Sequence, residues 1–141
     1  MRSFHWSCLI LCLNFPFLLN AQIQFDRSYA QPFGLTDVGN EADPVFVDID
    51  NDGDFDAFIG AGSGDTKYFE NVGDAQNPVF ASFVNNPFGL VNLVEDAAPV
   101  FVDIDNDGDF DAFLGNDLGD VRYFENVCLL YTSPSPRDDP L

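Results

Sequence analysis

Short apolar runs separated by turns rich in Gly, Asp and Asn follow one another along the central part of the chain. The runs are rich in Val, Ile, Phe and Tyr, which favour strands, and Gly, Pro or Asp residues bound them. No stretch of about 11 residues shows the 3.6-residue period of an amphipathic helix. The pattern predicts four strands here, over 45–47, 57–59, 67–70 and 79–83.

This pattern is written twice, with a period of 55 residues. Residues 44–58 recur letter for letter at 99–113, and 23 of the 29 positions in 44–72 are identical in 99–127. Repeats near this length are typical of solenoids, propellers and arrays, whose units cannot bury their faces alone. Four short strands per repeat fit a blade of a β-propeller. The expected fold is all-β, with two four-stranded, blade-like repeats of an incomplete propeller. The predicted boundaries are 22–76 for repeat 1 and 77–127 for repeat 2.

Phenylalanine occupies corresponding places in the strands of both repeats. Because such rings are most simply accounted for as the hydrophobic core, we expect all of them to be buried. They are Phe46, Phe58, Phe69, Phe80, Phe101, Phe113 and Phe124.

The first 21 residues resemble a secretory signal peptide. Arg2 supplies a positive charge, residues 9–19 are mostly apolar, and the small residue Ala21 suits a cleavage point. Asn14 and Pro16 interrupt the apolar run, which is too short to span a bilayer comfortably. We expect a secreted or cell-surface protein with no membrane insertion after cleavage.

The last segment, 128–141, differs from everything before it. Residues 128–138 read CLLYTSPSPRD, which matches a translated sequencing-library adapter without a mismatch. We expect this segment to be adapter-derived or a disordered tail, and the chain to be an N-terminal fragment of a longer repeat protein. Two repeats leave open sheet edges and apolar faces, so the piece 22–127 alone is expected to be marginally stable or prone to aggregate.

The chain of 141 residues carries 24 acidic and 5 basic side chains, a formal net charge of −19. This charge excludes a nucleic-acid-binding protein, which needs a basic footprint, and disfavours docking on anionic membranes. A hydrophobic content of 46% also excludes a disordered acidic chain. Between residues 22 and 127 there is no Cys and no His, which excludes disulfides, thiolate metal sites and a Ser-His-Asp triad there.

Much of the acidic charge is concentrated in one loop per repeat. Residues 48–56 read DIDNDGDFD, and residues 103–111 repeat them. Five carboxylates within nine residues repel one another unless a cation neutralises them. Calcium prefers six to eight oxygen ligands, whereas magnesium dehydrates reluctantly and zinc and copper prefer nitrogen and sulfur. The loops therefore predict two Ca²⁺ sites, one per repeat.

The spacing also predicts a role for each position. Alternate side chains of the loop point inward, so loop positions 1, 3, 5 and 9 offer carboxylates, position 7 offers its backbone carbonyl, and the residue at position 4, Asn51 in repeat 1, points outward. Gly53 at position 6 allows the sharp turn. The predicted ligands of the first site are Asp48, Asp50, Asp52, Asp54 and Asp56, and those of the second are Asp103, Asp105, Asp107, Asp109 and Asp111. An EF-hand is excluded, because position 12 is Ile59 or Leu114 where that loop needs Glu, and because the flanks alternate like strands.

These residues resemble FG-GAP repeats, also called VCBS-type repeats, the units of integrin-α-like β-propellers. In each repeat Phe-Gly, at 33–34 or 88–89, precedes a box ending in Pro44 or Pro99 and then the acidic loop. The boxes depart from Gly-Ala-Pro, whereas the acidic loop matches fully. The resemblance covers about residues 29–127 and implies four-stranded blades with a calcium site in the hairpin between the first two strands. It further implies binding on the loops of one propeller face, with calcium structural rather than catalytic.

The expected function is a secreted calcium-binding repeat module for extracellular protein or glycan binding or adhesion, with further repeats of the same chain as neighbours. The fragment itself is expected not to be an enzyme, while an enzymatic domain in a longer protein remains open. Alternatives are the non-catalytic propeller part of a secreted polysaccharide-degrading enzyme and a structural spacer in an adhesin. Carboxylates outside the loops that could serve glycoside hydrolysis are Glu41, Glu70, Glu95 and Glu125.

Overall fold

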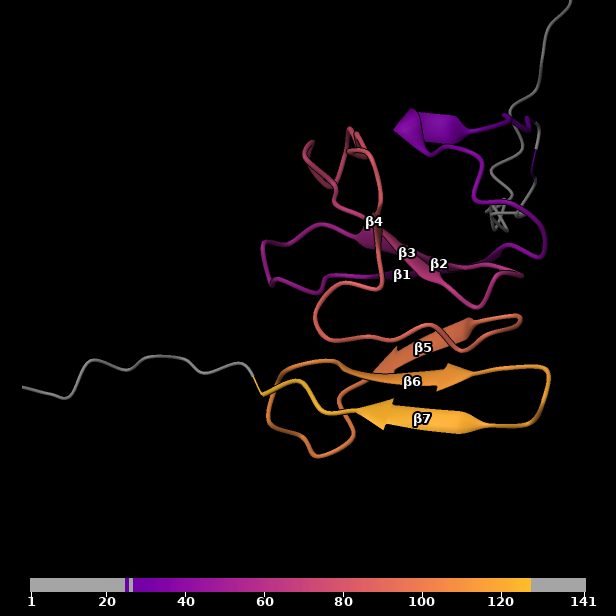
Figure 1. Ribbon diagram of the computed structural model, residues 1–141. Coiled ribbons are helices and arrows are strands. Elements are labelled where there is room, and N and C mark those ends of the chain that lie inside the picture. The colour runs from indigo at the N-terminus through magenta and orange to yellow at the C-terminus, as the bar shows by residue number, and fades with distance from the viewer. Residues whose placement is uncertain (1–24, 26, 128–141) are drawn as a thin grey trace, which may run out of the picture.

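The computed structural model describes residue 25 and residues 27–127. The predicted signal peptide, residues 1–21, and the segment 128–141 lie outside the described residues. The described chain forms two antiparallel sheets that lie one above the other (Figure 1). Within this part of the chain, no helix is long and apolar enough to cross a membrane.

The first sheet has four strands in the order β1-β2-β3-β4. A single 3₁₀ turn, η1 (Pro32–Gly34), precedes it in the described residues. Phe46 pairs with Ala57, and Phe58 pairs with Tyr68, so these two pairs face opposite sides of the sheet. Its strands are β1 (Asp43–Val47), β2 (Asp56–Gly60), β3 (Thr66–Phe69) and β4 (Val84–Asn85).

The second sheet has the order β5-β6-β7 and repeats the first three strands of the first. Its strands are β5 (Ala98–Val102), β6 (Asp111–Gly115) and β7 (Val121–Phe124). Each begins and ends 55 residues after its counterpart in the first sheet, so the sequence period is also the structural period. The all-β prediction and the first three predicted strands of each repeat are confirmed, whereas the second repeat has three strands and not the expected four within the described residues.

The fourth predicted strand, over 79–83, is wrong. Phe80 forms only an isolated bridge with Asn71, whereas β4 follows at Val84–Asn85 and pairs with Tyr68 and Lys67. The pairing shifts by one residue between the two places, as it does at a β-bulge, which interrupts the ladder. β4 also lies past residue 76, so the first sheet extends beyond the first sequence repeat.

The main core lies between the two sheets. Val47, Phe58 and Tyr68 of the first sheet pack on Ala112 and Leu114 of the second. Leu90 and Leu93, from the segment that connects the sheets, complete this cluster. The sheet faces are therefore joined by one apolar layer, and this layer fixes how the two acidic loops sit relative to each other.

The opposite face of the first sheet has its own smaller core. Ala57, Ile59, Phe69 and Phe80 are buried there, with Leu35, Val38 and Phe83 packed against them. Leu35 and Val38 are the counterparts of Leu90 and Leu93, so each sheet is covered on the same face by the segment that precedes it.

The expectation that every repeated Phe is buried holds in part. Phe58, Phe69 and Phe80 are buried, and Phe101, Phe113 and Phe124 are half-buried. For Phe46 the prediction is wrong, because 49% of this residue is exposed. Its counterpart Phe101 packs against Phe58 of the preceding sheet with ring centroids 4.4 Å apart. No sheet precedes the first one among the described residues, so Phe46 has no such partner.

Candidate metal centres

Each acidic loop connects the first two strands of its sheet. In the first loop Asp48 directly follows β1 and Asp56 opens β2. Gly53 has φ +95°, and nothing lies within 4 Å of where its Cβ would be, so the position needs glycine for its backbone conformation and not for space. Asn51 is also left-handed, with φ +60°, which Asn tolerates better than most residues, and it is exposed as predicted. Thus the turn predicted at Gly53 is confirmed.

The second loop has the same backbone. Gly108 has φ +101° and Asn106 has φ +63°, at the places of Gly53 and Asn51. The two loops, which have identical sequences, therefore adopt the same turn conformation, although they belong to sheets with different numbers of strands.

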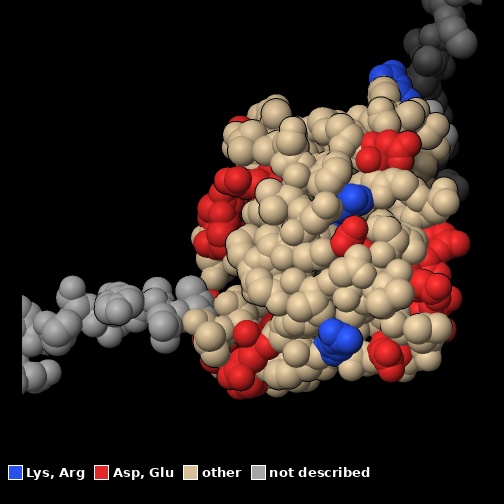
Figure 2. All heavy atoms as spheres, viewed as in Figure 1, with Lys and Arg blue, Asp and Glu red and all other residues tan. Residues whose placement is uncertain are grey.

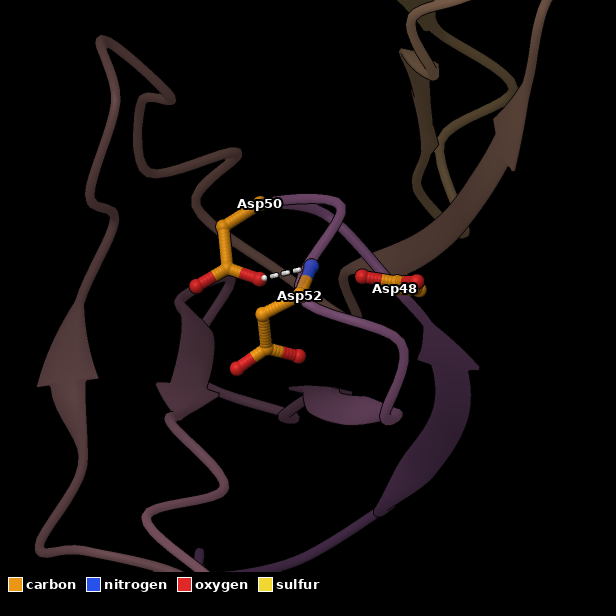
Figure 3. Close-up of side chains that lie close together, drawn as sticks. All are labelled: Asp48, Asp50 and Asp52. Atoms are coloured by element: carbon orange, nitrogen blue, oxygen red, sulfur yellow. Dashed lines mark hydrogen bonds between the residues drawn. The ribbon is translucent and has the colours of Figure 1, made fainter. Parts of the chain in front are cut away.

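The turn gathers three carboxylates in each loop. In the first loop they come from Asp48, Asp50 and Asp52, each of which offers one oxygen, and these oxygens lie within 4.8 Å of one another. Figure 3 shows the three side chains around this turn. In the second loop, one oxygen each of Asp103, Asp105 and Asp107 likewise lie within 4.8 Å of one another. The structure therefore holds two acidic triads that could bind a metal ion.

Backbone N–H groups within the loop orient these carboxylates. The amide of Gly53 donates to Asp48 Oδ2 (3.1 Å), that of Asp52 donates to Asp50 Oδ1 (3.2 Å), and that of Asp54 donates to Asp52 Oδ1 (3.0 Å). Such bonds leave the other lone pairs of each carboxylate free to accept a further partner.

The second loop repeats these three bonds. Gly108 donates to Asp103 Oδ2 (3.2 Å), Asp107 to Asp105 Oδ1 (3.2 Å), and Asp109 to Asp107 Oδ1 (3.0 Å). An additional bond joins the amide of Asp107 to Asp103 Oδ1 (3.1 Å). The carboxylates of both loops are thus held by the backbone.

Two carboxylate oxygens of the first loop are buried and have no hydrogen-bond partner among the described residues. They are Asp48 Oδ1 and Asp56 Oδ2, at the first and last predicted ligand positions. A buried acceptor without a partner costs about 1–3 kcal/mol, and more when it is charged. A hard cation bound at Asp48, Asp50 and Asp52 would satisfy Asp48 Oδ1, so these three residues fit the ion that the spacing predicts.

Asp54 and Asp56, with Asp109 and Asp111, do not belong to the triads. Asp56 Oδ1 accepts a hydrogen bond from the backbone amide of Asn71 (2.7 Å), and Asp111 Oδ1 accepts the matching bond from Asn126 (2.7 Å). The last Asp of each loop therefore ties the loop to the end of the third strand.

Sequence reasoning missed this role of Asn71 and Asn126. The signal that could have found it is the recurrence of Glu-Asn after the third strand of both repeats. The Asn71 side chain does more, because its Oδ1 accepts the amides of Gly73 (3.0 Å) and Val79 (2.9 Å). Asn71 thus organises the loop that follows β3.

Electrostatics in the first loop favour a bound cation. Burial raises the pKa of the Asp56 carboxyl, and burial together with the charge of Asp52 raises the pKa of Asp54. Burial and the nearby Asp56 charge also raise the pKa of Tyr68. In Figure 2 acidic side chains gather along the edge of the molecule where the two loops lie in Figure 1. A cation in the loop would offset this repulsion.

The surroundings of the loops differ from those of an EF-hand, as predicted. Strands flank both loops, and the residues at position 12, Ile59 and Leu114, lie within β2 and β6 and are buried. Neither residue can supply the bidentate carboxylate that an EF-hand needs.

Comparisons of this chain with protein-family models, with curated proteins and with solved structures find no match. The structure itself shows an all-β chain with two antiparallel sheets. It has one acidic triad that could bind a metal ion in the β1–β2 turn and another in the β5–β6 turn.

Proposed function

We propose that this chain is a secreted, calcium-binding repeat module of the FG-GAP or VCBS type, built as part of a β-propeller. The observation that carries the proposal is the duplicated acidic loop, with a buried, unpartnered oxygen at each end of its first copy. Calcium would be held by carboxylates of Asp48, Asp50, Asp52 and Asp56 and their counterparts in repeat 2, with the Asp54 and Asp109 carbonyls as further ligands. The ion would neutralise the loop and hold the hairpin rigid.

The role of the ion in this proposal is structural. Each loop joins two strands whose side chains enter the core between the sheets, so a loop that repels itself open would loosen that core. A rigid edge of hairpin loops would then serve as the surface that binds an extracellular protein or glycan. Loops on a rigid scaffold are the usual carriers of binding residues.

Calcium-dependent stability tests the structural role. Extracellular calcium modules bind with a Kd of about 10⁻⁴–10⁻³ M. At about 10 mM Ca²⁺, linkage then predicts roughly 1.4–2.7 kcal/mol of stabilisation per site. Urea unfolding with and without Ca²⁺ should show this gain, and the same concentration of Mg²⁺ should give a much smaller one.

Variants in the two loops test whether the predicted ligands are responsible for the calcium-dependent stabilisation. Asp50→Ala and Asp105→Ala should each remove about half of the calcium-dependent stabilisation, since each disables one site. The control is Glu95→Ala, which removes the same charge from an exposed position outside the loops. If both loop variants keep the full calcium response, the site assignment is wrong.

Partner binding needs a separate assay. A glycan array probed with the labelled protein in Ca²⁺, and again after chelation with EGTA, should reveal calcium-dependent binding if the partner is a glycan. Calcium-dependent stability without any glycan binding would leave an extracellular protein as the proposed partner class.

A further inference from the structure

The second sheet buries one face and exposes the other. Ala112, Leu114, Phe101 and Phe124 point into the core between the sheets. Val100, which pairs with the half-buried Phe113, is 56% exposed on the opposite face, and Tyr123, which pairs with Phe113 from the other side, is 47% exposed. We call the face formed by Val100, Val102, Phe113 and Tyr123 the outer face of the second sheet.

The chain itself shows what fits such a face. In the first sheet the corresponding residues are Val45, Val47, Phe58 and Tyr68, and this face packs on the second sheet. The Phe58 ring lies 4.4 Å from that of Phe101, and the Tyr68 ring lies 5.1 Å from that of Phe88, centroid to centroid. At the internal interface, two aromatic rings of the first sheet, Phe58 and Tyr68, therefore pack against two aromatic rings of the second repeat, Phe101 and Phe88.

Both halves of this interface also occur without a facing sheet in the described chain. The ring centroids of Phe113 and Tyr123 lie 5.0 Å apart with the rings tilted, as those of Phe58 and Tyr68 do at 4.8 Å. At the other end of the molecule, the Phe80 ring lies 6.2 Å from that of Phe46, centroid to centroid, and the Phe80 amide donates to the Phe33 carbonyl (2.8 Å). Phe33 and Phe46 are 59% and 49% exposed, compared with 70% for Phe88 and a half-buried Phe101, their counterparts. Phe33 and Phe46 line an apolar hollow of about 230 Å³ with Pro32, Leu35, Phe55 and Phe80. We call this hollow the socket.

Backbone hydrogen bonds also join the two sides of the internal interface, and their counterparts at the two outer surfaces could form in the same way. Across the internal interface, the amides of Leu93 and Ala97 donate to the carbonyls of Gly64 (2.9 Å) and Ala61 (3.2 Å). The corresponding donors beside the socket are the amides of Val38 and Ala42, and they donate no hydrogen bond within residues 27–127. By the 55-residue correspondence their matching acceptors are the carbonyls of Gly119 and Asn116, in the turn between β6 and β7.

A pair of glycines marks how close the two sheets come. A Cβ on Gly60 would lie 1.7 Å from the Ala97 carbonyl oxygen, so the second sheet leaves no room for any side chain there. The corresponding Gly115 opens on the outer face, where the nearest atom to its Cβ would be the Ala98 oxygen at 3.9 Å. Nothing in the described chain needs glycine at position 115, whereas a docked sheet would.

We propose that the outer face of the second sheet docks into the socket of a second copy of this chain, head to tail. Phe113 and Tyr123 of one copy then meet Phe33 and Phe46 of the next, as Phe58 and Tyr68 meet Phe88 and Phe101 within one copy. The two surfaces are different, so each docked copy still offers one of each, and the assembly grows rather than closing as a symmetric dimer.

Charge opposes this association. The correspondence brings Asp117 of one copy near Glu41 of the next, at the places where Gly62 and Asp96 approach each other within one chain. The formal net charge of −19 adds a general repulsion between copies. We therefore expect association to strengthen as salt rises from about 0.05 to about 0.5 M, because salt screens these charges.

The test measures mass against concentration by analytical ultracentrifugation, in Ca²⁺ and about 0.15 M salt. The protein is the chain 22–141, which keeps every residue that the structure describes. The wild type should grow beyond the dimer as its concentration increases. Gly115→Ala places a methyl group against the Ala42 carbonyl of the next copy and should weaken association about 100-fold or more. The control Val91→Ala changes a partly exposed side chain outside both surfaces and should leave association unchanged.

Mixing two defective variants gives the sharpest result. Phe46→Gln damages the socket but keeps the outer face, and Gly115→Ala damages the outer face but keeps the socket. Each alone should be monomeric, and a mixture of the two should form a dimer that grows no further. Far-UV circular dichroism checks that both fold, and Val100→Gln replaces Gly115→Ala if that variant does not.

Other outcomes overturn the proposal. A wild type that stays monomeric up to about 1 mM shows that the two surfaces do not bind each other. Association that survives Gly115→Ala shows that copies meet through other surfaces. If the chain ending at residue 127 associates but the chain 22–141 does not, the segment 128–141 is the occupant instead of a second copy. None of these outcomes depends on the calcium sites, so a failure here leaves the proposed calcium binding standing.

Discussion

Phe58 and Phe113 offer a comparison in which local sequence is held constant. Both lie within the same 15 letters, PVFVDIDNDGDFDAF, and both follow the same acidic loop. Phe58 is fully buried between the sheets, where its ring contacts Phe101 and Tyr68, whereas Phe113 is half-buried on the outer face of the second sheet. Any difference between the two alanine variants therefore reports on tertiary packing.

We expect Phe58→Ala to cost about 3–5 kcal/mol of unfolding free energy, the usual cost of emptying a core Phe site. Phe113→Ala loses contacts on one side only and should cost about 1–2 kcal/mol. The difference of about 2–3 kcal/mol corresponds to about 1–2 M in urea midpoint for an m value of about 1.5 kcal/mol/M.

The assay is urea unfolding in Ca²⁺, followed by far-UV circular dichroism. A protein concentration near 1 µM keeps copies apart, so that docking does not bury Phe113. Should Phe58→Ala fail to fold, Phe58→Leu and Phe113→Leu replace the pair, with an expected difference of about 1 kcal/mol. Equal costs for the two positions would refute the packing of the first sheet on the second.

Three further predictions follow, two from single residues and one from the piece that holds both repeats. Asn71→Ala leaves two backbone amides without their acceptor and should cost about 1–3 kcal/mol in thermal unfolding, while Asn126→Ala, whose Oδ1 accepts none in the described chain, should cost clearly less; equal costs would contradict this. Hydrogen bonds from Asn92 and Asn86 lower the pKa of Asp65 below its ordinary 3.8, so the stabilisation by its carboxylate is complete above that pH and is lost as the pH falls through the lower, folded-state pKa. Asp65→Asn should therefore flatten the acid limb of stability measured below pH 4, and an unchanged limb would exclude this role. The piece 22–127 alone, measured by calorimetry, should lack a cooperative, monomeric transition when calcium is chelated.

The geometry of the acidic loops could be predicted from the sequence, because residue types such as glycine restrict the backbone conformation at their positions. Gly53 and Gly108 have the positive φ that the loop spacing requires, and alternate Asp residues converge as the period of an extended turn predicts. The first three strands of each repeat were predictable for a similar reason, since their Val, Ile and Phe side chains alternate between the two faces of a sheet.

Features that depend on neighbours were not predictable. Phe46 and Phe101 have identical surroundings in sequence, yet only Phe101 has a preceding sheet to pack against. The bulge that displaces the fourth strand to Val84–Asn85 depends on the Asn71 side chain and on the amide of Phe80, which donates to Phe33. Periodicity carries no information on the contacts of Phe101 with Phe58 and of Phe80 with Phe33, because both join residues distant in the sequence.

The central claim is that each acidic loop holds one calcium ion, and counting bound ions tests it most directly. The chain 22–141 would be dialysed against buffered Ca²⁺ at about 2 mM in 0.15 M salt, and bound calcium would be measured by elemental analysis. The account predicts two ions per chain at saturation, one ion for Asp50→Ala, and none for the variant that combines Asp50→Ala with Asp105→Ala. Binding of no calcium by the folded wild type, or of two ions by the double variant, would contradict it.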